Sequence, residues 1–163
     1  MIPNIVIRDG GPADADFVAG IAVEAWRPIY EHARETLGPE LFTYLHTDWE
    51  AEKARQVRRA CEADTAGEVL VATLDGVIIA FVSFSQRAPE VGEIGNNAVR
   101  PDYQSRGIAT RLYEAALDKL RAAGMLYVSV STGGDPAHAP ARRAYEKVGF
   151  GQALPSVTYH RRL

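Results

Sequence analysis

Residues 99–110, with the sequence VRPDYQSRGIAT, constrain the fold more than any other stretch of this chain. The pattern is typical of a strand end, a tight turn, a loop of small residues and the first turn of a helix. A helix start leaves backbone N–H groups without partners in the helix, and the helix dipole adds partial positive charge there. Gly107 and Ala109 have almost no side chain, so an anion can approach the backbone itself. The stretch therefore predicts a phosphate-binding loop between a strand and a helix.

The composition predicts a single domain over residues 1–163. A chain of this length, with 47% hydrophobic and 24% charged residues, can bury a core without a disulfide or a metal. The net charge of −3 argues against general binding to nucleic acid or to an acidic membrane. Cys61 is the only cysteine, so no internal disulfide can form and a reducing compartment is expected. The four histidines are scattered, and we expect no metal site.

The start of the chain shows no signal-peptide pattern, and its apolar runs are too short to span a bilayer. We therefore expect a cytoplasmic protein with no membrane partner.

The first half of the chain predicts a strand and two helices. Residues 5–7 form a short β-rich run, and a helix that starts near Pro12 should end before Pro28. Residues 28–46 are expected to be irregular. Thr47 and Glu50 then have the spacing of a capping box, which predicts a helix that reaches about Ala63.

The middle of the chain predicts a β-hairpin followed by a β-α-β unit. Residues 68–74 and 77–85 flank Asp75-Gly76, a strong hairpin signal. Residues 91–99 form a third strand that Gly95-Asn96-Asn97 interrupts, which indicates a bulge or a close approach by another group. A helix over residues 106–122 and a strand over 126–131, expected to be buried on both sides, complete the unit. Its two strands should be parallel, with ligands at their carboxyl ends.

The last part of the chain predicts a short helix over residues 140–148 that Gly149 ends. Residues 152–162 then predict a final strand pair, broken near Pro155.

Two segments resemble the motifs of the GNAT superfamily of N-acetyltransferases. Residues 104–109, QSRGIA, are similar to the motif Gln/Arg-x-x-Gly-x-Gly/Ala and follow a similar strand exit at 99–103. Residues 138–150, HAPARRAYEKVGF, resemble Asn-x-x-Ala-x-x-x-Tyr-x-x-x-Gly-Phe, with His138 where Asn is usual. The opening stretch, residues 7–14, is also similar, so the resemblance covers about residues 5–152.

The resemblance implies an α/β fold with a mixed, mostly antiparallel central sheet of six to seven strands. About four helices should cover its two faces, with one parallel β-α-β unit at the CoA site. The implied activity is transfer of an acetyl group from acetyl-CoA, as co-substrate, to an amine. By analogy with proteins of this fold that pair through tail strands, a homodimer is a possible assembly.

The resemblance also implies how CoA is held. Backbone amides of residues 105–110 would bind the pyrophosphate, and the strand end at 97–99 would pair with the pantetheine arm. His138 would replace the asparagine that contacts this arm. The implied CoA-binding residues are Asn97, Ala98, Val99, Gln104, Ser105, Arg106, Gly107, Ile108, Ala109, Thr110, His138 and Tyr145.

Catalysis needs a donor to the thioester carbonyl, an acid for the leaving thiolate and a base for the amine. The backbone N–H of Val99 is the expected donor, unless it only serves the sheet. Tyr145 is the expected acid, although a core aromatic residue beside Phe150 is an alternative. Glu93 is the leading candidate for the base, with His138 or a bound water as alternatives. Neither motif contains a cysteine, so direct transfer is expected.

The acceptor site is expected opposite CoA, with Trp26, Tyr30 and Asn96 as candidate substrate contacts. Aromatic residues nearby suit an amine beside an apolar group, or they simply pack in the core. Four classes of substrate remain open: a small amine, an antibiotic-like amine, an amino acid or a peptide N-terminus. Other possible functions are a non-catalytic acyl-CoA sensor, a dinucleotide-binding protein, and an enzyme that acetylates aminoacyl-tRNA, which the acidic composition disfavours.

Overall fold

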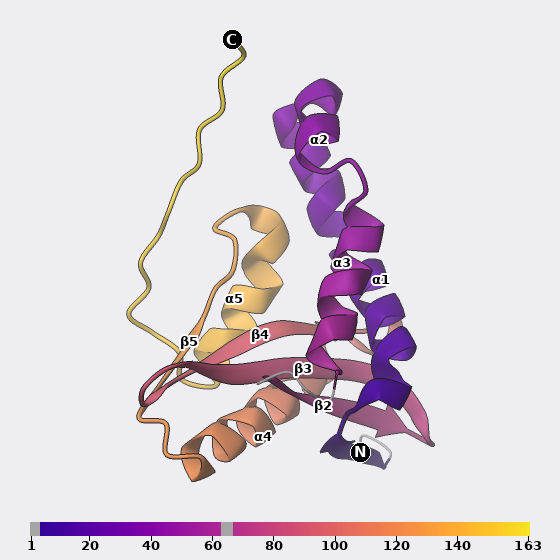
Figure 1. The fold of residues 1–163 in the computed structure, drawn as a ribbon, viewed down its shortest axis with the longest axis vertical. Coiled ribbons are helices and arrows are strands. Elements are labelled where there is room, and N and C mark those ends of the chain that lie inside the picture. The colour runs from indigo at the N-terminus through magenta and orange to yellow at the C-terminus, as the bar shows by residue number, and fades with distance from the viewer. Residues whose placement is uncertain (1–3, 63–66) are drawn as a thin grey trace.

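A single five-stranded sheet forms the centre of the protein (Figure 1). The computed structural model describes residues 4–62 and 67–163. The first four strands pair antiparallel in chain order, and the fifth pairs parallel to the fourth. The strands are β1 (Ile5–Asp9), β2 (Gly67–Leu74), β3 (Val77–Ala88), β4 (Val91–Val99) and β5 (Tyr127–Val130). The sheet is mixed and mostly antiparallel as predicted, but over the described residues it has five strands rather than six to seven.

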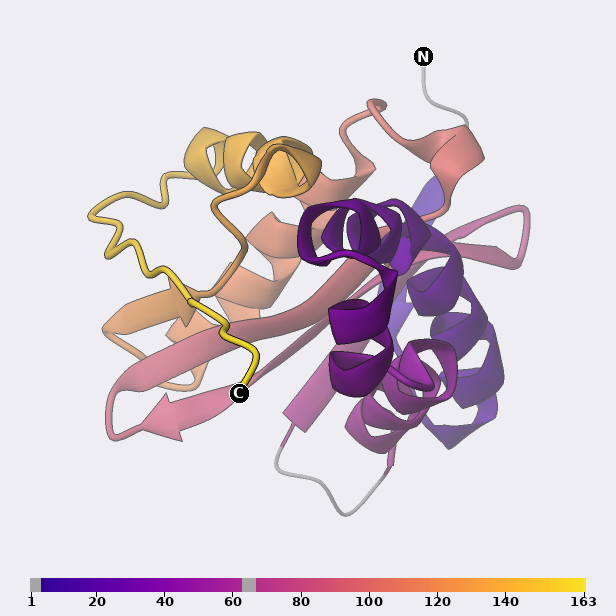
Figure 2. The ribbon, with the colours of Figure 1, turned by 90° about the horizontal axis from the view of Figure 1, so that it is seen from above.

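Helices cover both faces of this sheet (Figures 1 and 2). They are α1 (Ala15–Leu37), α2 (Pro39–Leu45), α3 (Trp49–Ala60), α4 (Ile108–Ala122) and α5 (Ala139–Lys147). Three 3-10 turns precede α1, α4 and α5, at Pro12–Asp14, Pro101–Tyr103 and Pro136–His138.

The two faces of the sheet bury separate apolar clusters, because side chains alternate between the faces of a strand. One cluster joins α4 and Tyr145 of α5 to the sheet, and the predicted face of α4 is buried in it: Ile108, Leu112, Ala116 and Leu120. The other cluster joins α1 and α3 to the opposite face, and it contains the buried Cys61. The sheet therefore separates an α4 side from an α1 and α3 side.

A bulge in β4 changes this alternation. Val82 of β3 pairs with Asn97 and Phe84 pairs with Ile94, so β4 has one extra residue between the two pairs. A Cβ on Gly95 would lie 2.6 Å from Ser83 Oγ, so a larger residue would have to displace this hydroxyl. As the interrupted pattern predicts, the strand is irregular at Gly95 and Asn96, and the side chain of Asn97 turns to the α4 side.

The first helix is longer than predicted. It continues through Pro28 to Leu37, and α2 follows at once, so residues 28–46 are largely helical rather than irregular. Aromatic packing accounts for this, because Tyr30 stacks on Trp49 of α3 with ring centroids 4.1 Å apart and meets the edge of Phe42 of α2. This packing outweighs the cost of a proline inside a helix.

The predicted capping box of the next helix is wrong. Asp48 is the N-cap residue and makes no side-chain cap bond, while Thr47 Oγ1 donates to the carbonyl of Thr43, 2.6 Å away. The predicted end at Ala63 lies outside the described residues, and α3 ends at Ala60.

Two predictions about the other end of the sheet are also wrong. Strand β5 is the edge strand and is not buried on both sides, since Tyr127 is 72% exposed. Residues 151–163 contain neither helix nor strand and run along the outside toward α2, where Arg162 pairs with Glu40 (Figure 1). The strand pair predicted over residues 152–162 is therefore absent from the described structure, in which this tail is exposed throughout.

Candidate active site

Strands β4 and β5 separate to form a fork. They pair only from Val91 to Ile94, so the second half of β4 is unpaired on the side that faces β5. The N–H of Arg100 donates to the carbonyl of Ile79 on β3 at 2.9 Å. Successive N–H groups of a strand point to opposite sides, so the N–H of Val99 points into the fork. The backbone of β4 thus offers hydrogen-bonding groups to an extended ligand.

The loop before α4 is the second part of the site. Ser105 and Gly107 have φ angles of 60° and 77°, and a Cβ on Gly107 would meet nothing within 4 Å. Within the part of the chain that the structure describes, no side chain accepts a hydrogen bond from the N–H groups of residues 105–110. These N–H groups are therefore available to an anion at the start of α4, as the sequence predicts.

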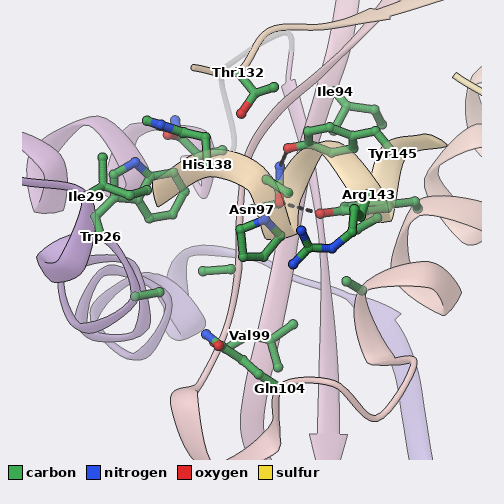
Figure 3. Close-up of a pocket in the computed structure, with 18 of the residues that line it drawn as sticks. Trp26, Ile29, Ile94, Asn97, Val99, Gln104, Thr132, His138, Arg143 and Tyr145 are labelled. Atoms are coloured by element: carbon green, nitrogen blue, oxygen red, sulfur yellow. Dashed lines mark hydrogen bonds between the residues drawn. The ribbon is translucent and has the colours of Figure 1, made fainter. Parts of the chain in front are cut away.

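A pocket of about 890 Å³ extends from this loop across β4 (Figure 3). The α4 loop and α5 form one wall, and α1 and α3 form the other. The volume lies within the range of ligand pockets of about 300–1,000 Å³. The pocket can hold two reactants, one against each wall, with β4 between them.

Tyr145 lies in the first wall, only 7% exposed, and is linked to β4. Its hydroxyl oxygen accepts a hydrogen bond from Asn97 Nδ2 at 2.9 Å, while Asn97 Oδ1 accepts one from the Tyr113 hydroxyl at 2.6 Å (Figure 3). Burial raises the pKa of Tyr145, and the hydrogen bonds with Asn97 and Tyr113 only partly offset this. The phenol therefore stays protonated at neutral pH, and its own proton is not used in these two bonds.

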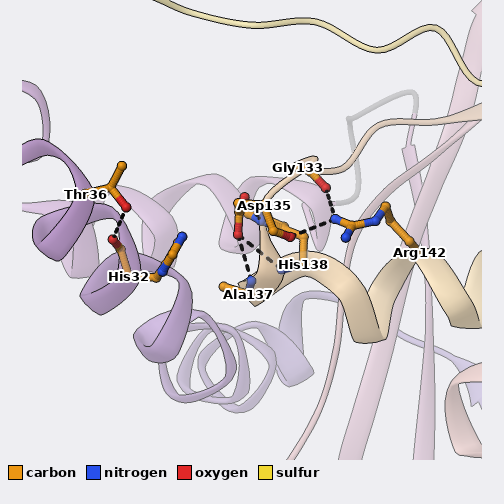
Figure 4. Close-up of polar contacts among 7 residues, drawn as sticks. All are labelled: His32, Thr36, Gly133, Asp135, Ala137, His138 and Arg142. Atoms are coloured by element: carbon orange, nitrogen blue, oxygen red, sulfur yellow. Dashed lines mark hydrogen bonds and ion pairs between the residues drawn. The ribbon is translucent and has the colours of Figure 1, made fainter.

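His138 and Asp135 form a pair at the start of α5 (Figure 4). Asp135 Oδ2 lies 2.6 Å from His138 Nδ1, and Asp135 Oδ1 accepts from the N–H of Ala137. Desolvation alone would raise the pKa of Asp135, but the hydrogen bond and charge of His138, with the backbone bonds, lower it. A carboxylate can only accept, so Nδ1 must carry the proton and Nε2 is left for another partner.

The loop around this pair is fixed in place. The guanidinium of Arg142 donates to the carbonyls of Gly133 and Asp135, at 2.6 and 2.8 Å (Figure 4). A Cβ on Gly133 would overlap the imidazole of His138, so glycine is required there. The imidazole is held in one orientation on the pocket wall.

The second wall carries Trp26, Lys53 and Gln56, which face Glu93 and Asn96 on β4. Lys53 Nζ lies 4.6 Å from the centre of the Trp26 ring and 3.2 Å from Asn96 Oδ1. The sequence analysis missed Lys53. Its position on α3 gave no motif, and only the fold brings this helix against the bulge of β4.

The structure brings most of the predicted site residues together and leaves two outside. Tyr30 does not line the pocket and instead packs on Trp49 and His46. Arg106 points away, donating to the carbonyl of Asp102. The predicted residues that line the pocket are Trp26, Glu93, Asn96, Asn97, Ala98, Val99, Gln104, Ser105, Gly107, Ile108, Ala109, Thr110, His138 and Tyr145.

Comparison with known proteins identifies the family. A model of the acetyltransferase (GNAT) family matches residues 20–150, which include the fork, the loop and Tyr145. This chain belongs to the GNAT acetyltransferase family. Enzymes of this family use acetyl-CoA, and the resemblance of the two motifs is confirmed.

One curated relative is mycothiol acetyltransferase of Sanguibacter keddieii, which is 36% identical over 163 residues. The match covers 96% of this chain but only 47% of the relative, so the chain spans about half the length of that protein.

Solved structures of GNAT proteins share the fold at low identity. A ribosomal-protein-alanine N-acetyltransferase from Brucella melitensis biovar Abortus 2308 has a TM-score of 0.64 at 20% identity, over 97% of this chain and 100% of that one. A PaiA N-acetyltransferase from Thermoplasma acidophilum, solved in complex with coenzyme A, has a TM-score of 0.68 at 18% identity, over 91% and 90%.

Within residues 4–62 and 67–163, no group of three or more His, Cys, Asp or Glu residues could hold a metal ion. No helix in these ranges is long and apolar enough to cross a bilayer.

Proposed function

We propose that this GNAT protein transfers an acetyl group directly from acetyl-CoA to a primary amine of a small molecule or peptide. The observation that carries the proposal is the hydroxyl of Tyr145, which lines the pocket beside the fork and accepts, rather than donates, in its bond with Asn97. Two of the similar solved proteins are named N-acetyltransferases, which supports an amine as the acceptor.

The donor would bind in the fork. Backbone N–H groups of the loop from Ser105 to Thr110 would hold the pyrophosphate, and Arg143 and Lys147 on the same wall would add positive charge. The pantetheine amides would pair with the free edge of β4, and the N–H of Val99 would donate to the thioester oxygen. Loss of one such donor in other enzymes costs about 2.7–4 kcal/mol of transition-state stabilisation.

The amine nitrogen would then attack the thioester carbon, and the carbon–sulfur bond would break. Tyr145 would give its proton to the leaving thiolate and regain one from solvent. Cys61 is buried on the α1 and α3 side of the sheet and does not line the pocket, so it is not placed to accept the acetyl group first.

We propose His138 as the base that takes the amine proton, through Nε2, with Asp135 as the residue that orients it. The support is the 2.6 Å contact of Asp135 with Nδ1, which leaves only Nε2 for a substrate. Glu93 also lines the pocket and remains the alternative base, acting directly or through a water.

A non-catalytic acyl-CoA sensor is the alternative function, and the family match and the named acetyltransferases do not favour it. The test is release of free CoA thiol from acetyl-CoA with a panel of amines, polyamines, amino acids and peptides. Release with at least one amine is expected. Tight acetyl-CoA binding without release for any member of the panel would support the sensor instead.

In the same assay, Tyr145→Phe should lower kcat about 10²–10⁴-fold, the usual contribution of general-acid catalysis. The KM for acetyl-CoA should change little, because the ring and its packing remain. Equal kcat in the variant and the wild type would remove Tyr145 from the mechanism.

A further inference from the structure

Lys53 is a cation in the pocket that the reaction proposed above does not use. It projects from α3 toward β4 and lines the second wall, opposite the fork. Its ammonium donates to Gln56 Oε1 at 2.9 Å and to Asn96 Oδ1 at 3.2 Å. Its stem and charge also lie over the ring of Trp26, 4.6 Å from the ring centre.

All of the partners of this ammonium are uncharged. No carboxylate of the described residues forms an ion pair with Lys53. Two amide oxygens and a ring face fix the position of the cation without neutralising it, and one N–H of the three remains available. A half-buried cation held in this way is a site for an anionic group.

Burial also lowers the pKa of Lys53, and the neighbouring Glu52 charge opposes this effect. An anionic ligand beside Lys53 would raise this pKa again, because an opposite charge favours the charged ammonium.

The other charges of the pocket agree with this assignment. Arg143 and Lys147 lie on the first wall, near the proposed phosphate positions, so they are separated from Lys53 by β4. Glu93 lies on the same face of β4 as Asn96, three residues earlier, and can attract the amine of an acceptor. The acceptor half of the pocket thus offers one negative and one positive group.

We infer that the acceptor is an amine that also bears a carboxylate, with Lys53 binding the carboxylate and Trp26 contacting the carbon skeleton. This inference rests on the proposed function, since it names the class of amine that the same pocket takes. α-Amino acids and short ω-amino acids have this chemistry.

The test uses product analogues, so that it does not depend on turnover. In the presence of CoA, N-acetyl-glycine, N-acetyl-L-leucine and N-acetyl-L-phenylalanine are each compared with the corresponding carboxamide, by tryptophan fluorescence. In the wild type, at least one carboxylate should bind about tenfold more tightly than its amide, the scale of a charge-assisted hydrogen bond. In Lys53→Met the preference should vanish, and in Lys53→Arg it should be largely retained.

The matched control is Arg55→Met, which removes an exposed cation from the same helix without touching the pocket. It should keep the preference of the wild type. Equal affinity for the carboxylate and amide in the wild type, no binding of any analogue, or an unchanged preference in Lys53→Met would each overturn the inference.

An assay of CoA thiol release distinguishes failure of this inference from failure of the proposed acetyl transfer. CoA release with amines that bear a carboxylate, at equal rates in the wild type and Lys53→Met, would support acetyl transfer while contradicting the role of Lys53. Selective binding of the carboxylates without release for any amine would contradict acetyl transfer and keep the anion site.

Discussion

The amide of Asn97 has one orientation that satisfies all of its neighbours. Its Nδ2 donates to the carbonyl of Gly95 at 3.0 Å as well as to Tyr145. Reversing the amide would place an oxygen against that carbonyl, which can only accept. Tyr113 must therefore donate to Oδ1, and Tyr145 must accept from Nδ2. A neutral asparagine thus determines that Tyr113 donates to it and that Tyr145 accepts from it.

At the same scale, His138→Asn should distinguish two roles of this histidine. Asparagine is the usual residue at this position of the GNAT motif that residues 138–150 resemble. It would still contact a pantetheine arm, but it cannot take a proton. We expect the acetyl-CoA KM to stay within a few-fold and kcat to fall about 10²–10⁴-fold, the range for general-base catalysis. Steady-state kinetics with a saturating amine checks this.

Asp135→Asn is the companion variant, because it removes the acceptor for Nδ1 and leaves the imidazole in place. It should lower kcat by a smaller factor than His138→Asn does, and it should change the dependence of kcat on pH. Full activity of His138→Asn at every pH would return the role of base to Glu93 or water.

At the scale of elements, the bulge of β4 depends on the contact between Gly95 and Ser83. Gly95→Ala would place a Cβ 2.6 Å from Ser83 Oγ, and this serine donates to the carbonyl of Asn96 at 3.0 Å. We expect the free energy of unfolding to fall by about 1–3 kcal/mol, the usual cost of overpacking. Urea denaturation measures this directly.

Ser83→Ala in the same chain provides the control, since it removes the clashing oxygen. The two substitutions together should cost less than the sum of their separate effects. Strict additivity would show that the serine does not limit the space at the bulge.

The connection from β1 to α1 also predicts an effect of pH on stability. A hydrogen bond from Arg8 lowers the pKa of Asp14, against desolvation and with help from the N–H of Gly11 and the Arg8 charge. This interaction stabilises the folded state above a pH of about 3.9, the pKa of an aspartate in the unfolded chain. The stabilisation is lost as the pH falls through the lower pKa that Asp14 has in the folded state. Asp14→Asn should therefore reduce the loss of stability between about pH 5 and 2, as urea midpoints will show.

Asp16→Asn is a suitable control for this measurement, because Asp16 is exposed and forms a surface pair with Arg58. It should leave the pH dependence of the urea midpoint close to that of the wild type.

Local sequence signals predicted the elements whose geometry is local. Asp75-Gly76 predicted the β2–β3 hairpin, and the apolar spacing of α4 predicted its buried face. The prediction that the first helix ends before Pro28 was wrong, because contacts with two other helices decide whether α1 continues past it. The place of Lys53 in the site could not be predicted from local sequence either, because this residue reaches the site only through the packing of α3 against the sheet.

At the scale of the whole molecule, donor binding and folding are linked through the loop before α4. Acetyl-CoA at 100 times its Kd should stabilise the wild type by about 2.7 kcal/mol and raise its Tm. Gly107→Val should lose this shift, because a branched side chain would occupy the open space at φ 77° where the phosphates are proposed to bind. Thermal unfolding with and without acetyl-CoA measures both effects.

Gly124→Val is a matched control for backbone strain. Gly124 also has a positive φ, 86°, with open space around it, but it lies at the other end of α4. The variant should lose intrinsic stability to a similar degree and still respond to acetyl-CoA. An equal acetyl-CoA shift in both variants would contradict the role of the loop.

The bulge in β4 decides which of two consecutive side chains faces each reactant. Asn96 bonds to Lys53 on the acceptor wall, and its neighbour Asn97 bonds to Tyr145 on the donor wall. If the same residues alternated strictly from Glu93, without the bulge, Asn97 would lie on the acceptor wall and the phenol would lose its partner. The pleat places these two side chains on opposite sides of the backbone, and the bulge assigns Asn96 to one substrate and Asn97 to the other.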